Sequence, residues 1–373
     1  MAIQMVDLQG QYLKIKSEID AAMQEVIDST QFINGYKVRE FARNLEQYLN
    51  VKHVIPCANG TDALQVAMMA LDLKPGDEVI VPCFTYVATA EVIALLGLTP
   101  VMVDVHPDTF QVDISEAAKK LTTKTKAIVP VHLFGQCADM DAVMTFAKEH
   151  GLFVIEDTAQ AIGAVYTTDS GEKISAGCIG DIGTTSFFPS KNLGCFGDGG
   201  AIFTNDDDLA AKIRMVCNHG QSKKYHHRTV GVNSRLDTLQ AAILDIKLKH
   251  LDEYCASRQA VAAKYDSAFA THPDLTIPHR DEKSTHVFHQ YTLKLSDSVN
   301  REDMRNYLSN HGIPSMVYYP LPLNKQEAYS SHDQFPVTED LCSRVLSLPI
   351  STELSEEQTD TIIEHVKTYL DNK

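Results

Sequence analysis

The sequence predicts an α/β fold, with a large domain built on a mainly parallel mixed sheet and a smaller C-terminal α+β domain. Short apolar runs alternate with helical patterns through the first two-thirds of the 373 residues. This alternation is typical of a parallel sheet that helices cover on both faces. A chain of this length has room for about two domains. We expect the large domain over residues 1–250 and the small domain over residues 251–373.

The strands of the large domain are predicted from short apolar runs that polar or turn-forming residues interrupt. These runs are Val54–Cys57, Glu78–Pro82, Thr99–Val103, Ala127–Val131, Phe153–Glu156, Thr184–Phe188 and Ala201–Thr204. Helical periodicity lies between them, over Asp62–Leu71, Ala88–Leu96, Ser115–Leu121 and Met140–His150. The residues before Val51 predict further helices packed on this domain.

The small domain is predicted from a change of pattern in the last third of the chain. A long helical pattern begins at Asp237, and its apolar residues recur at intervals of three and four toward Tyr265. We place the domain boundary within this helix, near Leu251. The elements expected beyond it are Gln290–Leu295, Arg301–His311, Ile313–Val317 and Glu356–Tyr369.

Composition excludes several classes of function. The net charge is -16, from 33 Lys and Arg against 49 Asp and Glu, which disfavours binding to nucleic acid. No apolar stretch approaches the roughly 20 residues of a membrane span, and no signal peptide is visible, so we expect a cytoplasmic protein without a membrane partner. The 8 cysteines form no Cys-x-x-Cys pair, which argues against a zinc ribbon.

A lysine and an aspartate follow two of the predicted strands. Lys191 lies in a turn after Thr184–Phe188, and Asp157 comes directly after Phe153–Glu156. Ligands of open α/β sheets bind at the carboxyl ends of strands, where these two side chains would meet. A lysine can form an imine with the aldehyde of pyridoxal 5'-phosphate (PLP), and an aspartate can keep its pyridine nitrogen protonated. The two residues therefore predict a PLP-dependent aminotransferase.

A phosphate site is predicted where the first strand passes into a helix. Gly60 and Thr61 open that helix, and its free amide groups, with the threonine hydroxyl, could bind a phosphate. Ser186 lies five residues before Lys191 and could add a second hydroxyl. The alternatives are an ordinary turn with an N-cap and a strand serine bonded to the backbone.

Two other candidates also have structural alternatives. Asp157 and Gln160 fit the spacing of a capping box at the start of a helix. Tyr86, at the end of a strand, could stack on the pyridine ring or could simply belong to the core.

The histidines do not predict a metal site. His286 and His289 are close in sequence, as are His226 and His227, but no carboxylate lies at a matching helical spacing. We therefore expect these rings to be hydrogen-bonded within the protein or to face solvent.

Five motifs in order resemble the DegT/DnrJ/StrS family of PLP-dependent sugar-nucleotide aminotransferases, and the resemblance covers nearly the whole chain. The motifs are Asn59–Leu64, Glu156–Gln160, Ser186–Lys191, Gly197–Ala201 and Gly231–Asp237. The resemblance implies a fold-type-I PLP aminotransferase. It also implies a homodimer in which both subunits build each active site.

The resemblance implies a role for each cofactor-binding residue. Lys191 forms the imine, Asp157 pairs with the pyridine nitrogen, and Gln160 contacts the ring near its 3-hydroxyl. Tyr86 stacks on the ring. The phosphate is held by Gly60, Thr61, Ser186 and Asn233 of the partner subunit. Family members that act as dehydratases have histidine in place of the lysine, so Lys191 argues against that activity.

Within the family, the chain is most similar to aminotransferases of UDP-2-acetamido-2-deoxy-3-oxo-glucuronate, which serve O-antigen synthesis. The segments that carry this similarity are Phe84–Glu91, His219–Gln221, Tyr225–His227, Asn233–Gln240 and Pro320–Gln326. It implies L-glutamate as amino donor and a UDP-sugar as acceptor. The implied substrate contacts are His219, Tyr225, Arg235, Tyr318 and Tyr319.

Two of these contacts stay open at the level of the sequence. Arg235 could bind a carboxylate of the donor or of the uronate, but it could equally form a structural ion pair. The subfamily usually has histidine at the position of Tyr318, and this departure leaves the details of sugar recognition undetermined.

Two alternative functions are compatible with parts of the sequence. The same cofactor residues could serve a 4-keto sugar, such as a dTDP-linked 6-deoxyhexose. A regulator that kept the fold and lost catalysis is also possible, although Lys191, Asp157 and Gln160 are all present and argue against it.

Overall fold

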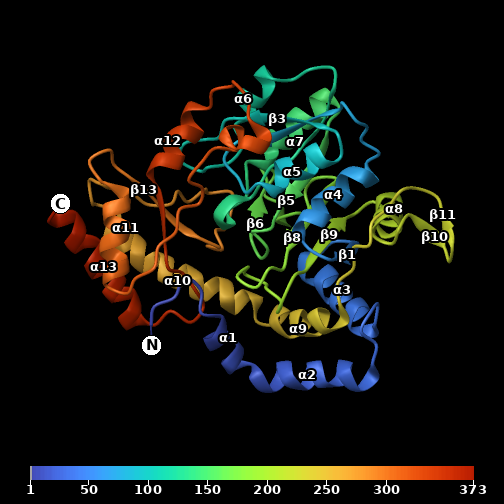
Figure 1. The fold of residues 1–373 in the computed structure, drawn as a ribbon, viewed down its shortest axis with the longest axis horizontal. Helices are drawn as coiled ribbons and strands as arrows, with labels where there is room; N and C mark the ends of the chain where they lie inside the picture. The colour runs from blue at the N-terminus through green and yellow to red at the C-terminus, as the bar shows by residue number, and fades with distance from the viewer. Residues whose placement is uncertain (1) are drawn as a thin grey trace.

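A seven-stranded mixed sheet lies at the centre of the first two-thirds of the chain (Figure 1). The computed structural model describes residues 2–373. The strand order is β1-β9-β8-β5-β4-β2-β3, and β9 alone runs against its neighbours. The strands are β1 (His53–Cys57), β2 (Glu78–Pro82), β3 (Thr99–Val103), β4 (Thr125–Ile128), β5 (Phe153–Asp157), β8 (Ile182–Ser186) and β9 (Gly200–Thr204). The predicted α/β class with a mainly parallel sheet is confirmed.

Helices cover both faces of this sheet because alternate strand residues point to opposite sides. Ile80 packs on one face, whereas its neighbours Val79 and Val81 pack on the other. One face carries α4 (Gly60–Ala70), α5 (Ala88–Leu95) and α8 (Asp207–Cys217). The other carries α3 (Tyr36–Leu49), α6 (Ile114–Lys119), α7 (Met140–His150) and α9 (Thr238–Leu248).

The N-terminal helices lie along the lower edge of the molecule in Figure 1. They are α1 (Leu8–Lys14) and α2 (Lys16–Ser29). Ile15 and Ile19 pack against Ile243 of α9, which attaches α2 to the layer below the sheet. The residues before Val51 therefore form helices, as the sequence predicts.

The prediction of a single long helix from Asp237 is wrong. The structure has two helices, α9 and α10 (Leu251–Phe269), separated by Lys249 and His250. The amide groups of these two residues donate to carbonyls three residues back, 3.2 and 3.0 Å away, which tightens the turn and ends α9. The domain boundary near Leu251 stays a prediction.

A second, three-stranded antiparallel sheet lies in the C-terminal part, at the left of Figure 1. Its strands are β12 (Leu275–Thr276), β13 (Tyr291–Leu295) and β14 (Val345–Leu348), and its helices are α10, α11 (Arg301–Asn310), α12 (Pro336–Arg344) and α13 (Glu356–Asp371). The element expected over Ile313–Val317 is not a helix or a strand of the sheet, since only Met316 bridges Ser347. Pro314 has no amide hydrogen to donate to a ladder.

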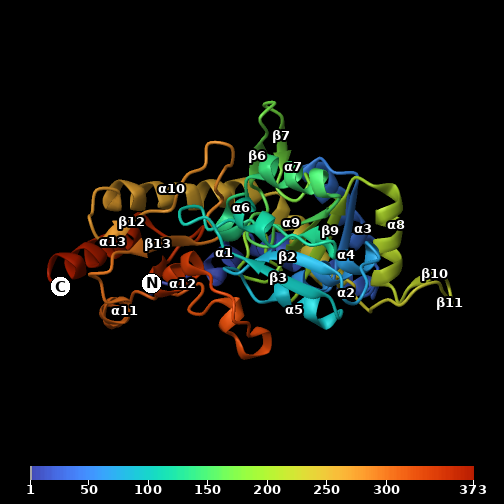
Figure 2. The same ribbon diagram turned by 90° about the horizontal axis from the view of Figure 1, so that it is seen from above.

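Two hairpins project from the body of the molecule (Figure 2). One joins β6 (Val165–Thr167) to β7 (Lys173–Ser175), and the other joins β10 (Gln221–Lys223) to β11 (His226–His227). We call residues 221–228 the β10–β11 arm. Short 3-10 helices complete the fold at Leu133–Gly135, Leu323–Lys325 and Glu327–Tyr329. Among residues 2–373, no helix combines the length and hydrophobicity that a bilayer span requires.

Candidate active site

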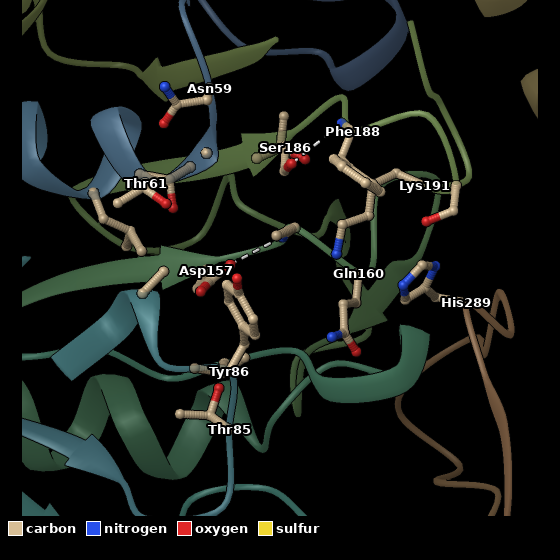
Figure 3. Close-up of a pocket in the computed structure, with 18 of the residues that line it drawn as sticks. Asn59, Thr61, Thr85, Tyr86, Asp157, Gln160, Ser186, Phe188, Lys191 and His289 are labelled. Carbon is tan, nitrogen blue, oxygen red and sulfur yellow. Dashed lines mark hydrogen bonds between the residues drawn. The ribbon is translucent and has the colours of Figure 1, made fainter. Parts of the chain in front are cut away.

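A cavity of about 830 Å³ opens at the carboxyl ends of the central strands (Figure 3). Residues at or beyond the ends of β1, β2, β5 and β8 line it, among them Thr61, Tyr86, Asp157 and Lys191. The C-terminal part contributes residues of two further segments, 289–290 and 318–319. The cavity is therefore at the edge of the sheet where the sequence predicts it.

The start of α4 forms one end of the cavity. Asn59 is its N-cap, and the side chain accepts a hydrogen bond of 2.8 Å from the amide of Asp62. A Cβ atom on Gly60 would lie 2.7 Å from that of Ser186, so only glycine lets the helix start approach β8 this closely. The amide groups of Gly60 and Thr61 have no partner within the helix, and the hydroxyls of Thr61 and Ser186 lie beside them. The N-cap and the predicted phosphate site are compatible.

Asp157 ends β5 and lies buried at the centre of the cavity wall. Burial raises the pKa of this carboxyl group, while a hydrogen bond from the amide of Ala159 and the charge of Lys191 oppose the rise. The Ala159 bond is 3.0 Å long and closes a local turn. An aspartate held in this way can share a proton with a nitrogen atom of a ligand.

The alternative that Asp157 and Gln160 form a capping box is wrong, because residues 158–164, between β5 and β6, form turns and not a helix. The side chain of Gln160 instead links two other segments. Its Oε1 accepts from the amide of Phe134 at 2.7 Å, and its Nε2 donates to the hydroxyl of Tyr319 at 3.1 Å. Gln160 therefore lines the cavity as a bridge between the large sheet and the C-terminal part.

Glu156 fixes the end of β5 from the opposite face of the sheet. Its carboxylate accepts the amides of Gly177, Ile179 and Gly180 at 2.9, 2.7 and 2.6 Å. The ring of His132 lies 2.9 Å from the same carboxylate, and both side chains are fully buried. A buried carboxylate with this many donors holds the strand in place, and so holds Asp157.

Lys191 lies in the loop after β8, and its side chain points into the cavity (Figure 3). Its own amide donates to the carbonyl of Phe188 at 2.8 Å. Loss of hydration lowers the pKa of the Lys191 amine to about 8, although the nearby Asp157 acts to raise it. A larger neutral fraction near neutral pH makes this amine a better nucleophile.

The aromatic candidates also line the cavity. Tyr86 is 58% exposed, so it does not belong to the core, and its ring stands over the space beside Asp157. Tyr319 lies 6.3 Å from it between ring centroids, and Tyr318 lies beside Tyr319. Gln290 hydrogen-bonds to Tyr318, whose pKa is raised by burial. The position of Tyr86 suits a ring-stacking role.

The other predicted contacts lie outside this cavity. Asn233 is exposed and bridges Asn218, while His219 and the 80%-exposed Tyr225 lie on or next to the β10–β11 arm. Arg235 lines a separate hollow of about 420 Å³ and makes no ion pair within residues 2–373. Within one chain, these residues do not meet Lys191, and their predicted roles stay predictions.

Sequence reasoning missed His289. Its ring was expected to be hydrogen-bonded or solvent-facing, but it is 4% exposed and its Nδ1 has no hydrogen-bond partner. Thr85 is a second missed residue of the cavity wall, and its buried hydroxyl is also without a partner. No group of three or more His, Cys, Asp or Glu side chains in the described part of the chain could hold a metal ion.

The groups around the cavity fit PLP. Helix amides and two hydroxyls at one end suit its phosphate, Asp157 suits the pyridine nitrogen, and the Lys191 amine suits its aldehyde. The unpartnered polar atoms of Thr85 and His289 indicate that the cavity is built for a polar ligand. When bound, PLP supplies a ring that accepts the electrons of a bond broken at the substrate carbon.

Known proteins resemble the chain over nearly its full length. An aminotransferase of UDP-2-acetamido-2-deoxy-3-oxo-D-glucuronate from Pseudomonas aeruginosa is 48% identical over 93% of this chain and 95% of its own. A UDP-N-acetyl-3-dehydro-alpha-D-glucosamine 3-aminotransferase from Acidithiobacillus ferrooxidans is 43% identical over 96% of this chain and 95% of its own.

The fold is also that of a solved aminotransferase. The crystal structure of DesV from S. venezuelae, in complex with a ketimine intermediate, matches with a TM-score of 0.94 and 39% identity over 99% of both chains. Residues 13–367 match the DegT/DnrJ/EryC1/StrS aminotransferase family. The chain belongs to this family and is a PLP-dependent aminotransferase.

Proposed function

We propose that the chain is a sugar-nucleotide aminotransferase that moves an amino group from L-glutamate to the 3-keto carbon of UDP-2-acetamido-2-deoxy-3-oxo-glucuronate. The observation that carries this choice is the 48% identity with the Pseudomonas aeruginosa enzyme of that name over 93% of the chain. The Acidithiobacillus ferrooxidans relative also takes a UDP-linked 3-keto sugar by name. We place the reaction in the cytoplasm, in the synthesis of surface polysaccharide such as O-antigen.

In this proposal, each residue of the cavity has its own role in the reaction. Lys191, whose amine is partly neutral near pH 8, takes the proton from the Cα of glutamate and later returns a proton to the sugar carbon. Asp157 holds a proton on the pyridine nitrogen. Gly60, Thr61 and Ser186 bind the phosphate, and Tyr86 keeps the ring in place by stacking.

The charges of the cavity support a site shared between two subunits. Glutamate and a UDP-uronate are both anions, yet among the described lining residues Lys191 is the one Lys or Arg, beside Asp62, Asp157 and Asp198. Cations for the carboxylates and the diphosphate must come from elsewhere. The exposed β10–β11 arm carries Lys223, Lys224 and Arg228 and projects from the body of the molecule (Figures 1 and 2).

We therefore propose a homodimer in which each arm and each 231–237 loop reaches the cavity of the other subunit. In that arrangement Asn233 contacts the phosphate, and Arg235 with His219 and Tyr225 contacts the substrate. Tyr318 and Tyr319 contact the sugar from within the same subunit. Sedimentation of the purified protein should give twice the monomer mass of 41.3 kDa.

Two acceptors that differ only at C6 test the proposed substrate. UDP-2-acetamido-2-deoxy-3-oxo-glucuronate carries a carboxylate there, and UDP-N-acetyl-3-dehydro-glucosamine carries a hydroxymethyl group. We expect the uronate to be aminated with the higher kcat/KM, with one 2-oxoglutarate formed per amino sugar, as mass spectrometry would show. A preference for the neutral sugar would overturn the uronate assignment, and amination of only a 4-keto 6-deoxyhexose would overturn the position of attack.

A further inference from the structure

The ring of His289 occupies the cavity wall next to Lys191 and Gln160 (Figure 3). It is 4% exposed, its Nδ1 is buried without a partner, and no hydrogen bond among residues 2–373 reaches its Nε2. Buried polar atoms of proteins are almost always hydrogen-bonded, so the unpartnered Nδ1 of this imidazole is unusual. Since Nδ1 is the buried nitrogen, Nε2 is the one that a ligand in the cavity can reach.

The backbone around His289 is held from several sides. The carbonyl of Val287 accepts from Asn192, next to Lys191, at 2.9 Å. Arg258 donates to the carbonyls of Phe288 and His289 at 3.1 and 3.4 Å, and the amide of Gln290 donates to Phe134 at 3.3 Å. The ring is therefore carried on a fixed segment between the lysine loop and the loop that Gln160 binds.

The segment also contains a backbone conformation that most residues avoid. Phe288 has a φ of 47°, in the left-handed region, where a bulky side chain is uncommon. Its ring stacks on His286 at 3.8 Å between centroids, and Arg280 lies 4.2 Å from the ring centre on its face. Such conformations persist where the surroundings hold them, and they cluster at functional sites.

The charge state of the ring limits what it can do. Burial, together with the charges of Lys191 and Arg258, holds the pKa of His289 well below its ordinary value. The ring is therefore neutral at physiological pH and offers one N–H donor and one lone pair. A neutral donor can bind a substrate oxygen without placing a second positive charge beside Lys191.

We propose that His289 is a substrate-binding residue, whose ring N–H donates a hydrogen bond to an oxygen carried next to the reacting carbon of the substrate. In the amino donor this is a carboxylate oxygen, and in the keto sugar it is a hydroxyl or amide oxygen. The position beside Lys191 supports this role, because Thr61 and Ser186 at the phosphate end and Asp157 lie across the cavity from it. The inference rests on the proposed transamination between glutamate and a keto sugar.

The test measures the two halves of the reaction separately in the holoenzyme. For wild type, His289→Phe and His289→Asn, we would titrate 2-methyl-L-glutamate, which has no Cα proton to lose, and follow the bound cofactor by its absorbance. The same variants would then be scored for KM and kcat with L-glutamate and with UDP-2-acetamido-2-deoxy-3-oxo-glucuronate.

We expect His289→Phe to weaken the binding of at least one substrate about tenfold, with unchanged PLP content and Tm, since a lost hydrogen bond is worth about one factor of ten. His289→Asn keeps an N–H donor and should recover part of the loss. If the affinity for both substrates falls, His289 binds both of them. If the affinity for only one substrate falls, His289 acts in that half of the reaction.

His286→Phe is the matched control. His286 is also buried, lies three residues earlier, and accepts the amide of Phe288 at 3.1 Å without lining the cavity. It should lower Tm and change the substrate affinities less than His289→Phe does. If His289→Phe does not fold, His289→Leu replaces it.

The inference would be overturned if a folded, PLP-loaded His289 variant bound both substrates with affinities within twofold of wild type. A wild-type protein without turnover would instead count against the proposed function.

Discussion

The cavity wall and the β10–β11 arm both carry lysines, but the two regions present them in opposite ways. Lys191 is partly buried, faces a buried Asp157, and sits on a loop that hydrogen bonds fix. Lys223 and Lys224 are exposed on a projecting two-stranded hairpin, next to the 80%-exposed Tyr225. Proton transfer needs groups that are dehydrated and fixed, whereas capture of an anion needs cations that can reach it. Changes in the cavity should therefore act on kcat, and changes in the arm on KM.

The largest expected effect is that of Lys191→Ala. We expect turnover to fall by at least about 10⁴-fold, because the amine that attaches the cofactor and carries the proton is lost. Ser186, Thr61 and the start of α4 should still bind the phosphate, and Tm should stay near that of wild type. Steady-state rates and the mass of the borohydride-reduced protein measure both points. Transamination at more than a trace, without added amine, would contradict the role of Lys191.

Asp157→Asn should have the next largest effect. The asparagine keeps the bond from Ala159 but cannot hold a proton on the pyridine nitrogen, so we expect kcat to fall by about 10²-fold or more. Glu156 and its donors stay in place, and thermal unfolding should therefore change little. Near-normal kcat would mean that Asp157 only closes the local turn.

Removing the cations of the arm should leave kcat alone and change KM. For the combined variant Lys223→Ala/Lys224→Ala/Arg228→Ala we expect the KM of the sugar nucleotide to rise roughly tenfold, because charge-assisted bonds to the substrate anion are lost. Since exposed charges are screened by salt, the wild-type KM should rise with ionic strength more steeply than that of the variant. Lys249→Ala/Lys264→Ala, with lysines away from the arm, is the control. If the triple variant and the control variant have the same KM for the sugar nucleotide, the arm does not bind the substrate.

Much of the cavity could be predicted from the sequence because its residues follow strands that local patterns define. The predicted bounds of β2, β3 and α7 agree with the structure, since each is a short apolar run or a helix with clear ends. Lys191 and Asp157 then follow from the rule that binding residues lie at the carboxyl ends of strands.

The residues that could not be predicted depend on contacts between distant segments. Gln160 has the spacing of a capping box, and only its contacts with Phe134 and Tyr319 exclude that alternative. His289 precedes an ordinary apolar strand, and nothing local to it indicates that the C-terminal part carries its ring to the cavity. The break between α9 and α10 is different, because it interrupts an unbroken helical pattern through local hydrogen bonds of Lys249 and His250 that the pattern does not indicate.

A mixing experiment tests whether the two regions belong to different subunits of one site. Lys191→Ala and Asn233→Ala/Arg235→Ala should each be inactive as a homodimer, since every site carries one defect. In a mixed dimer one site carries both defects and the other carries none, so random exchange of equal amounts should restore about a quarter of wild-type activity. Subunit exchange proven by native mass spectrometry, with no activity restored, would count against the shared site.

The smallest expected effect concerns the pH at which Lys191 reacts with PLP. It can be measured in the cavity and in the arm variants without catalytic turnover. Only a neutral amine attacks the aldehyde of PLP, and burial lowers the pKa of Lys191 to about 8. The rate of covalent loading of the apoprotein should therefore rise with pH and level off above about 8. Asp157 acts to raise this pKa, so Asp157→Asn should move the levelling point to lower pH.

The arm variant provides the contrast, because Lys223, Lys224 and Arg228 have no place in the cavity of their own chain. Its loading should level off at the same pH as that of wild type, and Lys191→Ala should show no covalent loading at any pH. Absorbance of the bound cofactor gives the rates, and borohydride trapping with peptide mapping locates the lysine. A loading rate that keeps rising to pH 10 and beyond would mean that the Lys191 amine is hydrated like a surface lysine, and the contrast between the two regions would then lose its physical basis.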